Sequence, residues 1–369
     1  MRSLLLKTSV VLTVVASLSI TPAAQPAAPQ AASSGPVLKS IGPLTFSPDG
    51  LLFAGDTQSA TIFALELGTL AQGGATGAKA IPGIDQQIAA LLGTDVREVA
   101  VTDLAVHPTT RNAYLSVMRG QGAAASPALL RVDGAGKIEL LAFDKMKFSK
   151  VSLPNAPAAN DSTPARNPRT QSITDMAFVD GRLYVAGLSN EEFSSKLRSL
   201  PYPFTTADNG TSVEIYHGNH GAFETRSPVY TFVPHKINGE TNLIAGYLCT
   251  PLVKFPVGSL QPGAKVLGTT IAELGNRNRP LDMVVYRKNG TEFLLMSNNS
   301  RGVMKIPTTG FDKAVKITSR VEAETSGVPF ETITAMKGVE QLDLLDANNS
   351  IVLARSDAGA LNLAVMALP

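Results

Sequence analysis

The chain of 369 residues is poor in several features that often define a protein class. It has one cysteine, Cys249, so no disulfide can form within it and the fold must be held together by packing. Its 32 basic and 30 acidic residues nearly balance, and a net charge of +2 favours neither nucleic acid nor an acidic membrane surface as a partner. It lacks a Gly-x-Ser-x-Gly elbow, a Cys-x-x-Cys-His haem motif and a phosphate-binding Gly-rich loop, which argues against the enzyme classes that use them.

The N-terminus has the composition of an export signal. Arg2 and Lys7 are basic, residues 4–20 are largely apolar, and small residues follow at 21–24. Polar residues interrupt the apolar stretch, whereas a permanent membrane helix needs about 20 predominantly apolar residues. We therefore predict a signal peptide at 1–24 and a mature protein that is periplasmic or secreted, with no membrane insertion after cleavage.

The rest of the chain divides into a leader and a domain. Residues 25–35 are rich in Ala, Pro and Ser and are predicted to be a disordered leader. Residues 36–369 are predicted to form a single domain, since one set of repeats runs through all of them.

A short phrase returns along this domain at nearly even intervals. The segment Thr102–Val106 is echoed by Thr174–Phe178 and Leu281–Val285, and there are three weaker copies. Equivalent positions are residues 43, 103, 175, 229, 282 and 341, which lie 60, 72, 54, 53 and 59 residues apart. Alternating apolar runs between Gly, Pro, Asn and Asp turns predict short strands in each interval. A repeat of this length built from short strands is typical of a β-propeller.

The six copies predict an all-β fold, a six-bladed β-propeller, with five or seven blades as alternatives because the fourth copy is the weakest. The last unit has three strands where four are expected, and we expect Pro36–Ile41 to supply its outer strand and close the ring. Residues 145–172 and 188–211 break the pattern and are predicted to be long loops. A short helix is predicted at Asp85–Gly93, with an acidic start and a Gly stop.

Residues 36–369 resemble a broad superfamily of six-bladed propellers that includes gluconolactonase-type hydrolases, soluble quinoprotein sugar dehydrogenases and exported repeat proteins that only bind. The segment Ser47–Ala54 is common to most of these groups and separates none of them. With no tryptophan, the chain lacks the Trp-Asp signature of the best-known propeller repeat. The lactonase-like group holds its metal with one Glu, two Asn and one Asp, but Pro43 stands at the first-blade position here. A quinone cofactor implies a His at the channel mouth, where none is expected.

The resemblance implies where polar side chains meet. In propellers, the starts of the inner strands and the turns between second and third strands lie on one face, at the mouth of the central channel. The inner strands contribute Asp103, Asp175 and Asp282. The turns contribute Arg119, Asn190, Asn298, Arg301, Arg355 and Asp357. These nine residues form the predicted ligand-binding set.

The three aspartates of this set have two interpretations. Each can accept backbone N–H groups and fix the geometry of its blade. Alternatively, Asp103, Asp175 and Asp282 can share a divalent cation such as calcium with Asn190 or Asn298, because hard cations take oxygen ligands. The arginines at the mouth could neutralise the carboxylates without a metal.

The histidines offer a separate metal hypothesis. His217 and His220, with His235 in the next blade, could bind a transition metal, since imidazole suits zinc and copper. Strand counting places all three on the face opposite the aspartates, where turn histidines are often simply solvated.

These observations predict an exported propeller that binds a small polar molecule or a partner protein of the envelope at an Asp/Arg/Asn-lined channel mouth. One alternative is a metal-dependent hydrolase of lactones or esters, in which the cation polarises a carbonyl and one Asp acts as base. Another is an envelope scaffold that works through residues 145–172 and 188–211. Fold alone does not decide among them.

Overall fold

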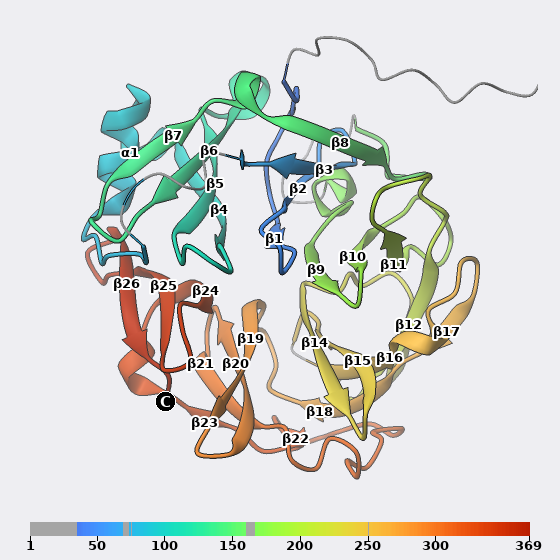
Figure 1. The fold of residues 1–369 in the computed structure, drawn as a ribbon. Coiled ribbons are helices and arrows are strands. Elements are labelled where there is room, and N and C mark those ends of the chain that lie inside the picture. The colour runs from blue at the N-terminus through green and yellow to red at the C-terminus, as the bar shows by residue number, and fades with distance from the viewer. Residues whose placement is uncertain (1–34, 69–73, 75, 160–166, 250) are drawn as a thin grey trace, which may run out of the picture. The chain divides into compact units, whose positions relative to one another are not determined.

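Six β-sheets are arranged radially around a central channel in the computed structural model (Figure 1). The structure describes residues 35–68, 74, 76–159, 167–249 and 251–369, and Gly35–Pro369 form one unit. The predicted signal peptide and all of the predicted leader except Gly35 lie outside the described residues. The chain is a six-bladed β-propeller.

Each sheet is one blade, numbered by the order of the inner strands along the chain, with strands given from the channel outward. Blade 1 contains β1 (Leu44–Phe46), β2 (Leu52–Asp56), β3 (Thr61–Glu66) and β8 (Lys147–Ser152). Blade 2 contains β4 (Val99–Val106), β5 (Ala113–Arg119), β6 (Ser126–Val132) and β7 (Ile138–Leu141). Blade 3 contains β9 (Asp175–Val179), β10 (Arg182–Leu188), β11 (Ser195–Pro201), β12 (Thr211–His217) and β13 (Ala222–Glu224), with β17 (Lys265–Leu267) parallel to β12.

The other three blades follow the same plan. Blade 4 contains β14 (Thr231–Ile237), β15 (Glu240–Gly246), β16 (Pro251–Pro256), β18 (Thr269–Glu273) and β22 (Ser326–Gly327). Blade 5 contains β19 (Pro280–Lys288), β20 (Thr291–Asn298), β21 (Gly302–Pro307) and β23 (Glu331–Thr332). Blade 6 contains β24 (Val339–Leu344), β25 (Asn349–Arg355) and β26 (Leu361–Ala367).

Strands in the middle of a blade are buried on both faces because they pack against two neighbouring blades. In β2, Leu52 and Ala54 belong to a hydrophobic cluster shared with blade 2, whereas Phe53 between them belongs to a cluster shared with blade 3. Successive side chains of a strand point to opposite faces, so a strand enclosed on both faces carries a continuous apolar run. This pattern also places blade 1 between blades 2 and 3.

The order of the blades around the ring differs from their order along the chain. The inner strand β1 contacts β4 on one side and β9 on the other, while β24 contacts β4 and β19. The ring order is therefore 1, 2, 6, 5, 4, 3 (Figure 1). After blade 2 the chain turns back, runs along the outer edge of blade 1 as β8, and only then enters blade 3.

The two predicted long loops contain blade strands, which corrects that part of the sequence analysis. Residues 145–172 include β8, whose polar side chains are largely exposed because it forms the outer edge of its blade. Residues 188–211 include β11, where Lys196 and Arg198 are buried inside a strand. Neither strand has the alternating apolar pattern that identifies the others, since one is mostly polar and the other buries charged residues.

The ring closes through a segment that the sequence analysis did not consider. Blade 6 has three strands, as predicted, and Ile81 meets the outer edge of β26. The N–H of Ile81 donates to the carbonyl of Leu363 (2.8 Å), and the N–H of Leu363 donates back (3.0 Å). The helix α1 (Ile84–Leu92), close to its predicted bounds, then packs between blades 2 and 6 and ends at Gly93 in the left-handed conformation.

Pro36–Ile41 does not complete blade 6, and the predicted closure is corrected accordingly. The buried carboxylate of Asp56 accepts the backbone N–H groups of Lys39 (2.7 Å) and Ser40 (3.1 Å), which fixes the segment at the end of β2. Leu38 and Ile41 are buried in the cluster between blades 1 and 2. Among the described residues, no helix is long and apolar enough to span a membrane.

The contact between Ile81 and β26 predicts a sensitive position. Ile81→Pro removes the N–H donated to Leu363 and a side chain of the core, so we expect it to lower the free energy of unfolding by about 3 kcal/mol or more. Ile81→Val keeps both backbone bonds and is the control, with an expected loss of about 1 kcal/mol. Urea unfolding of both variants provides the measurement, and equal losses would contradict this account of ring closure.

Candidate binding site

Aspartates of four inner strands face a small cavity of about 170 Å³ in the central channel. They are Asp103, Asp175, Asp282 and Asp343. In each, one carboxylate oxygen accepts the N–H of the next residue at 2.6–2.8 Å. The other oxygen accepts an N–H from the inner strand of a neighbouring blade, and these donors are Leu44 (2.6 Å), Phe232 (2.7 Å), Leu342 (2.8 Å) and Val106 (2.7 Å).

The repeated phrase found in the sequence is therefore a connection between blades. Beside Asp103, the hydroxyl of Thr102 donates to the carbonyl of Ile41 (2.9 Å), and Thr174 makes the same bond to Val229 (2.5 Å). Asp103, Asp175 and Asp282 thus take the first of the two roles considered for them, as acceptors for backbone N–H groups. Both oxygens of each carboxylate are engaged in these bonds.

Enclosure by the ring raises the pKa values of these carboxylates. The side chains of these aspartates are partly accessible from the channel, but their carboxylates are enclosed by the inner strands. This burial raises the pKa of Asp175 and of Asp343 to about 6. The pKa values of Asp103 and Asp282 lie well above the usual range, because of burial first and the charges of neighbouring channel aspartates in addition. The side-chain amide of Gln341 lies between the carboxylates of Asp103 and Asp282. Oriented so that its NH₂ group donates to both, it has its nitrogen 2.9 Å from Asp103 and 3.0 Å from Asp282.

A larger cavity of about 690 Å³ opens at the mouth of the channel, where blades 2, 5 and 6 meet. Asn298, Arg355 and Asp357, three of the predicted ligand-binding residues, line it together. The cavity is also lined by Thr102, Arg279, Asn299, Lys337, Glu340 and Gln341. Sequence reasoning did not find Arg279 or Lys337, which precede the inner strands β19 and β24.

Ion pairs hold two of the three cations of this mouth cavity. The guanidinium of Arg355 donates to both carboxylate oxygens of Glu340 (2.6 and 2.8 Å), and the ammonium of Lys337 lies 2.8 Å from Asp357. The guanidinium of Arg279 lies 5.8 Å from the centre of the Tyr230 ring and has no carboxylate partner among the described residues. Arg279 is exposed, so its charge is available at the mouth.

Three other predicted residues lie outside the lining of the mouth cavity. Arg119 is exposed and reaches the carbonyl of Gly93 at 3.5 Å. Arg301 is turned toward Glu324, with which it forms an ion pair. Asn190 lies in blade 3, away from the mouth cavity, and donates its backbone N–H to the backbone carbonyl of Asn155 (2.7 Å).

The structure brings His217 and His220 together and adds an acidic residue. Their Nδ1 atoms lie 2.9 and 2.6 Å from the same oxygen, Oε1 of Glu224. These two hydrogen bonds outweigh the effect of burial and lower the pKa of Glu224. Because β11 is a third strand that the sequence analysis missed, β12 is the fourth strand of its blade and ends on the mouth side, not on the opposite side as expected.

A buried carboxylate from the next blade faces this histidine pair. Oε2 of Glu273, in β18, lies 3.7 Å from Nε2 of His217, and neither atom has a hydrogen-bond partner. The other oxygen of Glu273 accepts the N–H of Gly218 (2.6 Å). Burial raises the pKa of Glu273 to about 7.

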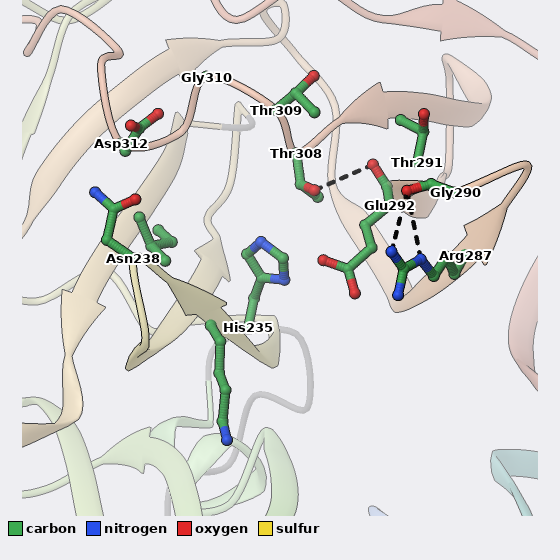
Figure 2. A pocket seen from close by; sticks show the side chains of 12 residues that line it. His235, Asn238, Arg287, Gly290, Thr291, Glu292, Thr308, Thr309, Gly310 and Asp312 are labelled. Atoms are coloured by element: carbon green, nitrogen blue, oxygen red, sulfur yellow. Dashed lines mark hydrogen bonds between the residues drawn. The ribbon is translucent and has the colours of Figure 1, made fainter.

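His235 is not part of this group and lines a different pocket of about 460 Å³ (Figure 2). This pocket lies between blades 4 and 5, and Figure 2 shows the His235 ring and the Glu292 carboxylate facing the same hollow. Arg287 is held beside it by bonds to the carbonyl of Gly290 (3.4 and 3.3 Å). Burial lowers the pKa of His235, and the charge of Glu292 opposes that shift.

Comparisons with known proteins give solved structures of low sequence identity and low TM-score. No protein-family model and no curated protein matches the chain. The chain is similar to a PQQ-bound aldose sugar dehydrogenase from Streptomyces coelicolor, with 11% identity, a TM-score of 0.36, and 91% of this chain and 97% of that chain covered. It is also similar to an exo-1,5-α-L-arabinanase from a bovine ruminal metagenomic library, with 12% identity, a TM-score of 0.37 and coverages of 73% and 93%. Extracellular domains 1–2 of Drosophila semaphorin 1b give 11% identity, a TM-score of 0.32 and coverages of 91% and 86%.

The connection between blades predicts the effect of removing one carboxylate oxygen. In Asp175→Asn the amide NH₂ must face one of two N–H donors, so an acceptor is lost, and we expect the free energy of unfolding to fall by about 1–3 kcal/mol. Asp357→Asn makes the same change in charge at an exposed ion pair, with an expected loss below about 1 kcal/mol. Chemical denaturation of both variants tests this. An unchanged free energy of unfolding in Asp175→Asn would contradict the role of Asp175 in joining blades 3 and 4.

The raised pKa values predict a pH dependence. The pKa of Asp343 is about 6 in the folded chain against an ordinary 3.8. Between these values the folded state binds more protons than the unfolded state, so this carboxyl makes the protein less stable as pH rises from about 4 to 6. In Asp343→Asn, we expect the free energy of unfolding to fall less between about pH 4 and pH 6 than it does in the wild type. Urea unfolding at several pH values provides the measurement. An unchanged pH slope in this variant would contradict the assignment.

Proposed function

We propose that this protein binds a small polar ligand with a negatively charged group in the mouth cavity. The observation that carries the proposal is the exposed guanidinium of Arg279, which has no carboxylate partner among the described residues, at the rim of a cavity of about 690 Å³. That volume lies within the range of about 300–1,000 Å³ that small-molecule sites occupy. The predicted signal peptide would deliver this binding activity to the periplasm or the cell exterior.

The charges around the cavity support an anionic ligand. Arg279, Lys337 and Arg355 contribute three positive charges, and Glu340 and Asp357 contribute two negative ones. The two hydrogen bonds from Arg355 to Glu340 restrict this guanidinium before a ligand arrives, which lowers the entropy lost on binding. A free guanidinium matches a carboxylate or phosphate through two parallel hydrogen bonds.

The alternatives have less support. A hydrolase with its metal on Asp103, Asp175 and Asp282 would need carboxylate oxygens that already accept backbone N–H groups. A scaffold working through residues 145–172 and 188–211 would need surface loops, whereas both stretches contain blade strands.

A ligand screen with two arginine variants tests the proposal. Hydroxy acids and sugar acids at millimolar concentration are screened by thermal shift against the whole protein, and hits are measured by calorimetry. We expect at least one to raise the melting temperature, and Arg279→Ala to weaken its binding by roughly tenfold to a hundredfold, as for the loss of a hydrogen bond to a charged group.

The control is Arg287→Ala, which removes the same charge from the pocket in Figure 2. We expect this variant to bind the ligand as the wild type does. The proposal fails if no anion of the panel stabilises the wild type, or if Arg279→Ala binds every hit with unchanged affinity.

A further inference from the structure

We propose that the β12–β13 hairpin carries a zinc site, with Nδ1 of His217, Nδ1 of His220 and a carboxylate oxygen of Glu224 as ligands. Glu273 is the positioning residue that orients His217. This inference is independent of the mouth cavity, because the hairpin lies at the outer edge of blade 3.

The three ligand residues already stand together. One ligand atom of each lies within 4.8 Å of the other two, and the two imidazole rings are 3.8 Å apart between centres. Zinc bonds of about 2.0–2.2 Å place the ligand atoms of a tetrahedral site about 3.4 Å apart. The observed contacts of 2.9 and 2.6 Å to Glu224 therefore need to open by less than 1 Å.

The hydrogen bonds of His217 leave a defect that a metal would remove. A neutral imidazole carries one proton, so donation from Nδ1 to Glu224 leaves Nε2 of His217 without a hydrogen. That bare nitrogen faces Oε2 of Glu273 at 3.7 Å, and both atoms are buried and unpartnered, with side chains 1% and 0% exposed. Two acceptors facing each other in a buried site are unfavourable, since neither recovers the hydrogen bonds lost from water.

Zinc at Nδ1 of His217 moves the ring proton to Nε2, which then points at Glu273. A metal-bound imidazole that donates its other N–H to a carboxylate is the usual arrangement around zinc. Glu273 is aimed for this role because its other oxygen is fixed by the N–H of Gly218 at 2.6 Å. The distance from Nε2 to Oε2 has to shorten by about 0.5 Å to reach the hydrogen-bond range.

The surroundings keep the fourth coordination position open. The side chain of His220 is 50% exposed and that of Glu224 is 23% exposed, so solvent reaches the site from one side. Two histidines, one glutamate and a water complete a tetrahedral set that zinc accepts. The bound ion would connect blade 3 to blade 4, because Glu273 lies in β18.

Zinc titration of the whole, metal-free protein tests the site. Calorimetry with zinc chloride is expected to show one ion per chain at micromolar affinity or better, with a rise in melting temperature. His220→Ala removes a half-exposed ligand with little risk to folding, and we expect it to weaken zinc binding at least a hundredfold and to abolish the thermal shift. His235→Gln, a histidine outside the group, is the control and should bind zinc as the wild type does.

A second variant separates positioning from structure. Glu273→Gln is expected to lower zinc affinity roughly tenfold to a hundredfold and to shift the visible spectrum of the cobalt(II)-loaded protein, while the melting temperature of the metal-free variant reports any purely structural loss. The proposal is overturned if the wild type binds no zinc at micromolar concentration, or if His220→Ala binds it as tightly as the wild type. Unchanged zinc affinity and cobalt spectrum in Glu273→Gln would remove the role of Glu273.

Discussion

The ring depends on carboxylates that accept N–H groups across the boundary between blades. An inner strand is paired on one side only, so its other edge presents backbone donors to the channel, and buried donors need acceptors. Asp103, Asp175, Asp282 and Asp343 supply these acceptors at the boundaries 1–2, 3–4, 5–6 and 2–6. Charged acceptors form stronger hydrogen bonds than neutral ones. The arrangement also confines several carboxylates to a narrow channel, where burial disfavours their ionised form.

This arrangement separates the structural centre of the molecule from its polar rim. The channel aspartates have both oxygens occupied, whereas the mouth cavity above them is lined by side chains that are paired with one another or exposed. Gln341 lies at the border, since it lines the mouth cavity and also meets two channel carboxylates. A ligand at the mouth would therefore touch the same side chain that screens Asp103 from Asp282.

The sequence was sufficient for the blade count and for part of the site, for a physical reason. The phrase around Asp103, Asp175 and Asp282 repeats because the same bond is needed at several blade boundaries, so each copy marks the inner strand of a blade. Asp343 was missed because alignment on Gln341 places it two residues too late, although it makes the same two bonds.

The order of the blades around the ring and the cluster of His217, His220 and Glu224 could not be predicted from the sequence. β8 pairs with β3 across about 80 residues of chain and is mostly polar, so neither local pattern nor spacing identifies it. Glu224 stands seven residues after His217, a spacing that means little until the hairpin turns it back onto the rings. Glu273 comes from another blade, and only tertiary packing places it beside His217.

The return of the chain along blade 1 has an evolutionary consequence. Proteins built from stacked units usually change length by duplicating or deleting one unit. Here β8 lies after blade 2 in the chain but completes blade 1, so excising β1 to β3 would leave β8 without its partner, and excising β4 to β8 would strip blade 1 of its outer strand. Residues 44–152 therefore form two interlocked blades, and because the same stretch places Ile81 at the edge of blade 6, its loss would also expose that edge.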